Sequence, residues 1–316
     1  MRISVVIPVF NGEQHIENCL KSVQAQTFGD FECLCVDNGS SDKTVQIVSD
    51  FAAQDGRFKL VVSDHAGKQA GARNKGLEQA RGDLITFIDA DDFVHPRMFE
   101  ILLSVMEREK ADAVGCAFKK EHHPYSGVFG TVKPFKTTVY DDPFTAFLTK
   151  RAVAVSACTR LFKRDCLKNN RFIEGIFFED VPWAFRLFSE IGRYAQISAP
   201  LYYYFINPAS TMRSDWSNEK TRSYIEVIRA VAAYTKACRP DDWKRVQKLV
   251  LNRRVKMIVK RLRKTRADKR AEAVDYARRE IGKLYDKGIV SYAGLKLRHR
   301  FAVWKLLKKR KVKSND

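Results

Sequence analysis

The N-terminal part of the chain alternates short apolar runs with amphipathic stretches. Residues 3–9 and 31–36 are largely apolar, as in strands that are covered on both faces. Between them, residues 16–23 carry apolar side chains at steps of three and four, which predicts a helix that buries one face. The same alternation predicts a helix over 45–52, a strand over 59–63, a helix over 71–81 and a strand over 84–90.

From residue 113 onward the spacing of apolar positions changes. We expect a strand over 113–118, a hairpin-like region to 139, helices over 144–154 and 179–191, a strand over 194–206, and helices over 217–237 and 242–265. Strands that alternate with helices predict an α/β fold with a doubly wound, mostly parallel, Rossmann-like sheet and right-handed crossovers. A helical, basic extension follows it at the C-terminus.

Acidic and amide side chains follow the ends of the predicted strands, at 11–13, 37–38, 64–65 and 89–92. In a doubly wound sheet, ligands bind beyond the carboxyl ends of the strands. Loop polarity alone does not explain why an acidic residue recurs at each of these ends. We therefore expect the ligand site along this edge.

The stretch Asp89-Ala90-Asp91-Asp92 holds the densest group of carboxylates. If strand geometry persists to its end, Asp89 and Asp91 point the same way and form a hard oxygen site, suited to Mg²⁺ or Mn²⁺ carrying phosphates. The alternative is a solvated acidic turn before a helix over 96–107. Neither a dinucleotide-binding glycine motif nor a P-loop follows the first strand. A metal and side chains such as Arg73 would then have to meet the charge of a diphosphate.

The net charge of +20 belongs to the C-terminal quarter of the chain. Residues 236–316 hold 28 Lys and Arg against 8 Asp and Glu, whereas residues 1–235 are neutral, which predicts an anionic partner for the basic end. The seven cysteines include no CxxC pair, which predicts a reducing compartment without disulfides. With no signal-peptide pattern and no apolar run near ~20 residues, we expect a cytosolic protein.

Five motifs in order resemble those of the family 2 glycosyltransferases with the GT-A fold, over residues 1–213. Their order and spacing carry the resemblance, since each motif alone is short. Asn38, Phe10 and Arg160 depart from the Asp, Tyr and Lys that are more frequent in the family. The motifs are Val5-Val6-Ile7-Pro8-Val9-Phe10-Asn11, Val36-Asp37-Asn38-Gly39-Ser40-Ser41-Asp42, Gly71-Ala72-Arg73-Asn74-Lys75-Gly76-Leu77, Phe87-Ile88-Asp89-Ala90-Asp91-Asp92 and Phe178-Glu179-Asp180.

The resemblance implies an inverting transfer of a sugar from a nucleotide diphosphate sugar, with a UDP-sugar as the expected donor. The acceptor would be a hydroxyl of a glycan or lipid-linked glycan in the synthesis of lipopolysaccharide, capsule or exopolysaccharide. It implies a divalent ion, Mn²⁺ or Mg²⁺, on Asp91, with Asp92 beside it, and a general base at Asp180. A capping group at the start of a helix is the alternative role for Asp180.

The resemblance also assigns the donor site. Asp37 would accept the imide hydrogen of the base, Arg73 would approach the base or the diphosphate, and Asp89 would bind the ribose. The full set of expected nucleotide-sugar-binding residues is Pro8, Phe10, Asn11, Glu13, Asp37, Asn38, Arg73, Asp89 and Ala90.

The implied catalytic domain spans 1–213, with a nucleotide-sugar-binding half at 1–112 and an acceptor-side half at 113–213, and a basic helical region follows at 214–316. Two other classes stay open. A metal-dependent nucleotidyltransferase would also pair a nucleotide with a metal, but the phosphate loop expected of it is missing. A nucleic-acid-binding protein would use the basic end, but it leaves the acidic strand ends unexplained, so we expect no nucleic acid partner.

The segment 295–313 alternates apolar and basic residues. Leu297, Phe301, Trp304 and Leu307 step by four, three and three positions, so they share one helical face. A basic helix of this kind suits an anionic membrane surface, so we expect peripheral contact with the inner face of the cytoplasmic membrane. A solvated tail, or one packed on the catalytic domain, is the alternative. The surrounding basic residues are Lys296, Arg298, Arg300, Lys305, Lys308, Lys309, Arg310 and Lys311.

Overall fold

A computed structural model describes residues 2–63, 68–123, 125–149, 155–206, 216–262, 265, 267–292 and 297–308. The chain divides into two compact units. The first comprises Met1–Gly175 and Glu179–Ser210, and the second comprises Ile176–Phe178 and Thr211–Asp316. The predicted strand end at 64–65 lies outside the described residues.

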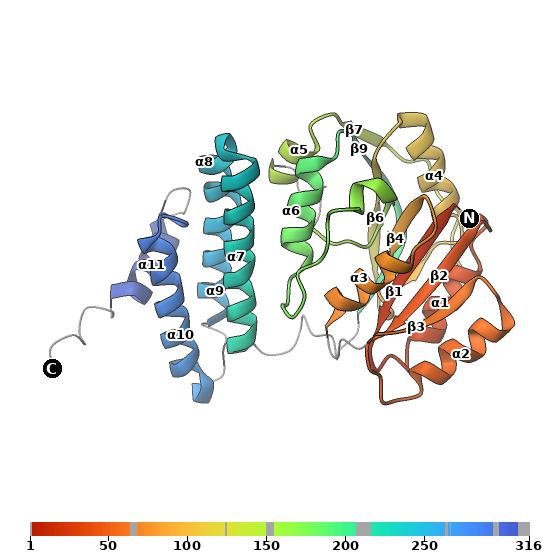
Figure 1. Cartoon of the computed structure of the whole chain (residues 1–316), viewed down its shortest axis with the longest axis horizontal. Coiled ribbons are helices and arrows are strands. Elements are labelled where there is room, and N and C mark those ends of the chain that lie inside the picture. The colour runs from red at the N-terminus through yellow and green to blue at the C-terminus, as the bar shows by residue number, and fades with distance from the viewer. Residues whose placement is uncertain are drawn as a thin grey trace. The chain divides into compact units, whose positions relative to one another are not determined.

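The first unit is built on a mixed sheet (Figure 1). Within the described residues its strand order is β3-β2-β1-β4-β8-β6-β9-β5, and β7 pairs with β9. The parallel half contains β1 (Ile3–Val9), β2 (Phe31–Asp37), β3 (Phe58–Val62) and β4 (Leu84–Phe87), connected by the helices α1 (Ile16–Gln24), α2 (Thr44–Gln54) and α3 (Gln69–Gln79).

The other half of this sheet mixes strand directions. β8 runs antiparallel to both β4 and β6, while β6 and β9 are parallel. The elements are β5 (Phe93–Val94), α4 (Met98–Glu109), β6 (Ala113–Glu121), β7 (Thr137–Tyr140), α5 (Pro143–Thr149), β8 (Arg160–Lys163), the 3-10 helix η1 (Arg164–Leu167), α6 (Asp180–Glu190) and β9 (Tyr194–Phe205). The predicted doubly wound, mostly parallel sheet is confirmed, but the predicted hairpin is wrong, because β7 pairs with β9 instead of β6.

The central strand β1 sets the position of the candidate site. All seven of its residues are buried, because β2 and β4 flank it and α3 lies close to it. Gly76 allows this approach, since a Cβ at that position would overlap the side chain of Val6. The register pairs Val9 with Asp37 and Val6 with Phe87, so the carboxyl ends of β1, β2 and β4 meet at one edge of the sheet.

The second unit is helical in its described part. Its first helix, α7, is capped by the Ser217 hydroxyl, which accepts the Lys220 amide at 3.1 Å. The helix predicted over 242–265 is interrupted by a π-helical turn, and α10 was not predicted from the sequence. The elements are α7 (Asn218–Cys238), the 3-10 turn η2 (Pro240–Asp242), α8 (Trp243–Val246), the π-helix η3 (Gln247–Leu251), α9 (Asn252–Leu262), α10 (Ala267–Asp286) and α11 (Leu297–Lys308).

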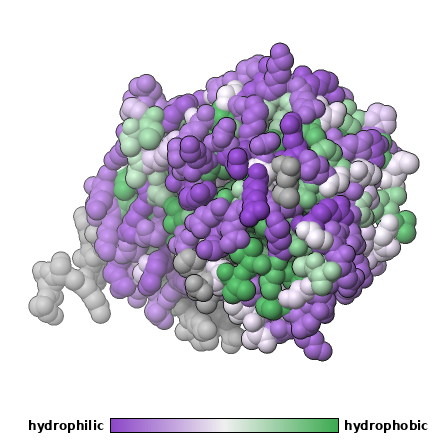
Figure 2. Space-filling view, turned by 45° about the vertical axis from the view of Figure 1, so that its right-hand side comes forward, coloured by the Kyte–Doolittle hydropathy of each residue, from purple (hydrophilic) through white to green (hydrophobic). Residues whose placement is uncertain are grey.

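The surface seen in Figure 2 is mostly hydrophilic, with hydrophobic residues gathered in small areas. All seven cysteines are free thiols in this structure. Among the described helices, none combines the length and the apolar character needed to cross a bilayer.

Glu32 is a buried carboxylate of β2 that ties neighbouring segments together. It accepts hydrogen bonds from the Ser4 hydroxyl at 2.8 Å, the Arg81 amide at 2.8 Å and the Lys59 ammonium at 2.9 Å. Burial alone would raise the pKa of the Glu32 carboxyl, but these hydrogen bonds outweigh it and lower the pKa below its usual value. The ionised carboxylate therefore stabilises the first unit.

Glu32→Gln should destabilise the first unit by about 1–3 kcal/mol at neutral pH, because an amide cannot accept all three hydrogen bonds. Since the folded pKa lies below the unfolded one, the contribution is present above the unfolded pKa and is lost as the pH falls through the folded pKa. Urea titrations followed by circular dichroism should show the difference from the parent shrinking from about pH 7 towards about pH 3. The control Glu17→Gln, at an exposed ion pair with Lys21, should change stability by less than about 0.5 kcal/mol. Equal stability of Glu32→Gln and parent at neutral pH would contradict this role.

Candidate active site

Asp89, Asp91 and Asp92 lie in a turn directly after β4. The strand ends at Phe87, earlier than predicted, so strand alternation does not determine where Asp89 and Asp91 point. The turn is instead closed by a backbone hydrogen bond from the Asp92 amide to the Asp89 carbonyl, at 3.0 Å. Asp89 and Asp91 are partly exposed, whereas Asp92 is buried.

Arg73 of α3 joins this turn to the start of α6. Its side chain is 5% exposed, and its guanidinium donates to Asp89 Oδ1 at 2.9 Å and to Glu179 Oε1 at 2.6 Å. The ring of Phe172 lies beneath it, 5.3 Å from the guanidinium carbon. Burial by itself would lower the pKa of Arg73, but Asp89 and Glu179, with a smaller contribution from Asp180, raise it. Arg73 is therefore a permanent buried cation between two carboxylates.

The residue after Arg73 anchors the segment that leads into α6. The Asn74 amide donates to the Phe172 carbonyl at 3.0 Å and to Glu174 Oε1 at 2.8 Å, and its oxygen accepts the Phe172 amide at 2.9 Å. The Phe172 ring stacks on Trp183 of α6 with centroids 4.7 Å apart. These contacts place Asp180, the first residue of α6, at a fixed distance from α3.

Tyr202 of β9 holds the other end of the acidic turn. Its hydroxyl donates to Asp92 Oδ2 at 2.6 Å and accepts the Asp89 amide at 3.2 Å, while the Phe205 amide donates to Asp92 Oδ1 at 2.9 Å. Burial, followed by the charges of Asp89 and Asp91, raises the pKa of the Asp92 carboxyl well above its usual value. Asp92 is thus a structural member of the turn. The sequence alone does not mark Tyr202 for this role.

The loops after β1 and β2 are fastened to each other by predicted site residues. Asn11 Oδ1 accepts the Ser41 amide at 2.9 Å, and Glu13 Oε2 accepts the Lys43 amide at 3.0 Å. Asn11 adopts a left-handed backbone conformation, with φ at 46°, a region that Asn tolerates better than most residues. The side chains of Asn11 and Glu13 therefore shape the loops, and their polar atoms are engaged with backbone amides.

Asp37, at the end of β2, closes the turn that follows it. Asp37 Oδ2 accepts the amides of Gly39 and Ser40, each at 3.1 Å. The neighbouring Asn38 is buried and donates to the Lys68 carbonyl at 2.8 Å. Its Oδ1 is buried with no hydrogen-bond partner in the described structure. Buried acceptors are normally hydrogen-bonded, so this oxygen could accept a hydrogen bond from a ligand.

The predicted residues thus form two groups at the same edge of the sheet. Pro8 is buried at the end of β1 and Phe10 is an exposed aromatic ring beside it, so the first group combines an apolar surface with Asn11, Glu13, Asp37 and Asn38. The second group contains Arg73, Asp89, Ala90, Asp91 and Asp180. Cys158 is an addition that sequence analysis missed. It is buried next to this second group, where burial and then the charge of Asp89 raise the pKa of its thiol.

The carboxylates of the acidic turn could take part in binding a divalent ion. Within the residues that the structure describes, no three His, Cys, Asp or Glu side chains converge as a metal cage would require. Asp89 is paired with Arg73, and Asp92 is buried and held by Tyr202. Asp91, the third carboxylate of the turn, is partly exposed. One or two carboxylates together with substrate phosphates are the usual protein ligands of Mg²⁺. The residues therefore fit an ion that arrives with a diphosphate.

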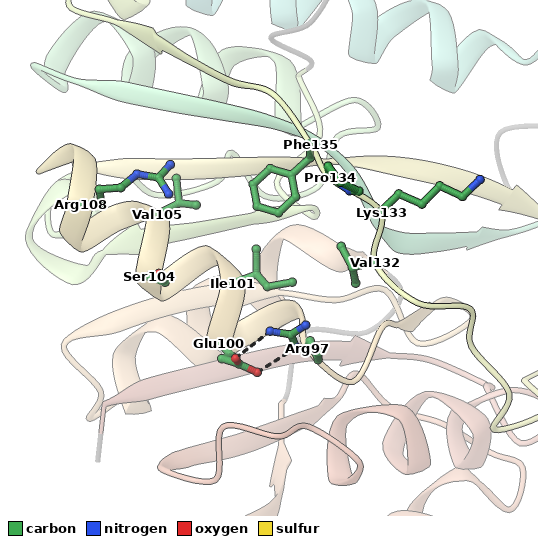
Figure 3. Close-up of a pocket in the computed structure, with 10 residues that line it drawn as sticks. All are labelled: Arg97, Glu100, Ile101, Ser104, Val105, Arg108, Val132, Lys133, Pro134 and Phe135. Atoms are coloured by element: carbon green, nitrogen blue, oxygen red, sulfur yellow. Dashed lines mark hydrogen bonds and ion pairs between the residues drawn. The ribbon is translucent and has the colours of Figure 1, made fainter.

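A separate groove lies between α4 and residues 132–135 (Figure 3). Ile101, Val105 and Phe135 form its apolar wall, and the ion pair between Arg97 and Glu100, at 3.0 Å, stands at one end. None of the predicted site residues lines it. We therefore assign no part of the candidate active site to this groove.

The fold of this chain is similar to that of a solved structure. S. aureus TarS in complex with UDP-GlcNAc has a TM-score of 0.71 and 20% sequence identity, over 98% of this chain and 90% of that one. The predicted GT-A-type fold is confirmed by this similarity.

Sequence relatives and a family model extend the comparison. The Bacillus subtilis protein named uncharacterized glycosyltransferase EpsJ is 32% identical over 218 residues, which are 66% of this chain and 62% of that protein. The chain thus spans less than two thirds of that relative. The Campylobacter jejuni protein named GalNAc(5)-diNAcBac-PP-undecaprenol beta-1,3-glucosyltransferase is 26% identical over 251 residues, 77% of this chain and 78% of that protein. Residues 4–169, more than half of the chain, match the family model described as glycosyl transferase family 2. The chain therefore belongs to glycosyl transferase family 2, as its motifs predicted.

Proposed function

We propose that this protein transfers a sugar from a nucleotide diphosphate sugar, with UDP as the nucleotide, to an acceptor hydroxyl with inversion at the anomeric carbon. The observation that carries the proposal is the Arg73 bridge, which holds the acidic turn at Asp89 and the start of α6 at Glu179 on one guanidinium. A donor-binding turn and a candidate general base are thereby kept in fixed relation. A fixed relation of this kind suits an inverting transfer, in which the nucleophile and the leaving group act on opposite faces of the sugar.

The donor would lie along the carboxyl ends of β1, β2 and β4. The exposed ring of Phe10 offers an apolar surface for the base, in a pocket that Pro8 would help to line. Asp37 Oδ1, which accepts the Ser40 amide only at 3.4 Å, would accept the imide hydrogen of the base. Asn11 and Glu13 shape this pocket through their loop contacts, and Asn38 offers its buried Oδ1. Asp89, next to Ala90, would bind the ribose through the oxygen that Arg73 does not take.

The metal would be held by Asp91 together with the diphosphate. A bound Mn²⁺ or Mg²⁺ supplies Lewis-acid stabilisation for the charge that develops on the departing nucleoside diphosphate. Arg73 does not replace that ion, since its guanidinium is buried and occupied by two carboxylates. We therefore assign Arg73 a positioning role and not the contact with the base or diphosphate that the resemblance implies.

The general base would be Asp180. Glu179, its neighbour, is 8% exposed and held by Arg73 at 2.6 Å, so its carboxylate does not face an acceptor. Asp180 is partly exposed at the first position of α6. A carboxylate there can take the proton of the acceptor hydroxyl as that oxygen attacks the anomeric carbon.

The names of sequence relatives support an acceptor class. The Campylobacter jejuni relative is named for transfer to an undecaprenol-linked glycan. We place this protein in cell-surface glycan synthesis, as lipopolysaccharide, capsule or exopolysaccharide, with a glycan or lipid-linked glycan acceptor. A lipid-linked acceptor would bring the protein to the inner face of the cytoplasmic membrane as a peripheral protein. The catalytic domain would span 1–213 and the basic helical region 214–316.

Asp91→Ala should lose Mn²⁺-dependent binding of UDP and lose transfer, because the protein's own ligand to the ion is removed. Isothermal titration with UDP, with and without Mn²⁺, measures this effect. Asp83→Ala removes an exposed aspartate at the opposite end of β4 and should bind UDP as the parent does. Undiminished metal-dependent binding by Asp91→Ala would rule out the assignment.

Asp180→Asn should keep the donor affinity within a few-fold of the parent, while turnover falls by about 10²–10⁴, the usual contribution of a general base. The assay measures released UDP over a panel of UDP-sugars and acceptors, together with the donor dissociation constant. Asp165→Asn, in the 3-10 helix η1, serves as the matched control and should retain turnover. If the donor affinity collapses and bound donor still reacts at the parent rate, Asp180 caps α6 or binds donor instead.

A further inference from the structure

The C-terminal helix α11 presents two aromatic side chains to solvent although it is packed in its own unit. Val303 is buried, and the Arg278 guanidinium of α10 donates to the Leu306 carbonyl of α11 at 2.8 Å. On other positions of the same helix, Phe301 is 61% exposed and Trp304 is 43% exposed. The helix is therefore held by one face while another face carries large apolar groups. Figure 1 shows α11 beside α10 within the second unit.

The two exposed aromatic rings form one continuous apolar surface. Their centroids are 5.5 Å apart and their planes are inclined by 28°. Among the described residues, the other large apolar side chains that are exposed all belong to the first unit. Single exposed apolar residues are common on proteins, whereas adjacent ones mark contact sites. The Phe301–Trp304 pair is thus a candidate contact site on the second unit.

The basic side chains around Phe301 and Trp304 favour an anionic partner. The Lys308 ammonium lies 4.5 Å from the centre of the Trp304 ring, and Lys305 and Arg300 are exposed on the same helix. The sequence of α11 contains no Asp or Glu. The whole region from 236 to 316 holds 28 Lys and Arg against 8 Asp and Glu. Of the four residues predicted to share this face, Phe301 and Trp304 are exposed neighbours, Leu307 is partly exposed, and the side chain of Leu297 lies outside the described residues. The buried residue Val303 lies on another face of the helix.

We propose that the Phe301–Trp304 surface of α11 docks on a lipid bilayer that contains anionic lipids, with the two rings entering the headgroup region and the basic side chains contacting lipid phosphates. Tryptophan next to Lys and Arg on one helix is the composition of interfacial helices. Two exposed rings inserted from a folded unit anchor a protein at the surface without spanning the membrane. This surface is distinct from the proposed catalytic residues, and its test does not use transfer activity.

The first test is co-sedimentation of the full chain with vesicles of phosphatidylcholine mixed with phosphatidylglycerol, and with vesicles of phosphatidylcholine alone. The parent should bind the mixed vesicles at low salt and lose affinity as salt rises. Phe301→Ser with Trp304→Ser should lower the partition coefficient by about tenfold or more, given the apolar area removed. The matched control, Phe118→Ser with Val128→Ser, removes two exposed apolar side chains of the first unit and should bind as the parent does. Thermal unfolding of each variant verifies folding.

A second pair of variants separates the α11 surface from general charge attraction. Lys305→Glu with Lys308→Glu should weaken vesicle binding strongly, because the Lys308 ammonium lies over the Trp304 ring and Lys305 is exposed on the same helix. Lys244→Glu with Lys248→Glu changes the net charge equally at exposed positions elsewhere in the second unit and should weaken binding much less.

Three results would overturn the proposal. The first is a parent protein that ignores the mixed vesicles at low salt. The second is equal loss of binding in the two Lys→Glu pairs, which would indicate diffuse attraction. The third is an aromatic double variant that loses binding to single-stranded DNA but keeps vesicle binding, which would make the surface a nucleic-acid site. Each outcome can be told apart from a failure of glycosyl transfer, since UDP binding is measured separately.

Discussion

The buried guanidinium of Arg73 connects two segments of the first unit that are far apart in the sequence. Burying a cation is unfavourable unless it is paired and hydrogen-bonded. Here Asp89 and Glu179 supply two carboxylates, and Phe172 covers the plane of the group. The planar fork of arginine suits such a double contact, whereas lysine would offer a single charged point. Removing either carboxylate would leave one buried N–H arm of the guanidinium without the partner it has here, so the turn after β4 and the start of α6 are positioned together.

The acidic turn divides its carboxylates among different tasks by their surroundings. Asp89 is partly committed to Arg73, and Asp92 is buried against Tyr202 and the Phe205 amide. Asp91 is partly exposed, and it is the residue to which we assign the ion. Asp89 thus pairs with Arg73, Asp92 is a buried hydrogen-bond acceptor, and Asp91 is the proposed metal ligand. Burial and hydrogen-bond partners, and not the residue type, separate these roles.

Local patterns predicted much of the fold because the parallel half of the sheet is buried on both faces. The strands at 3–9 and 31–37 agree with their apolar runs, and α1 and α6 agree with their three- and four-residue spacing. The family and the fold class were also predicted, because the motifs lie at the ends of these elements. Boundaries set by tertiary contacts were predicted less well. β4 stops at Phe87, three residues before the predicted end. The pairing of β7 with β9 was not predicted, because β9 lies far along the chain from β7.

The candidate site shows the same limit. Short motifs named the acidic turn and Asp180, but the contacts that organise them join residues more than a hundred positions apart, as in Arg73 with Glu179 and Asp92 with Tyr202. Neither pairing leaves a periodic signal in the sequence. Tyr202 stands in a run of three tyrosines, and only the register of β9 distinguishes it from its neighbours. The positioning role of Arg73 likewise depends on burial, which a motif does not reveal.

We propose that Asp91 carries a diphosphate-bound ion while Arg73 keeps Asp89 and Glu179 together. Anomalous diffraction from crystals grown with UDP and Mn²⁺ tests both parts in one measurement. We expect a manganese peak at coordination distance from the Asp91 carboxylate and the diphosphate, with the Arg73 guanidinium still between Asp89 and Glu179. Bound UDP with its manganese peak away from Asp91, or a guanidinium that has left both carboxylates to contact the diphosphate, would contradict it.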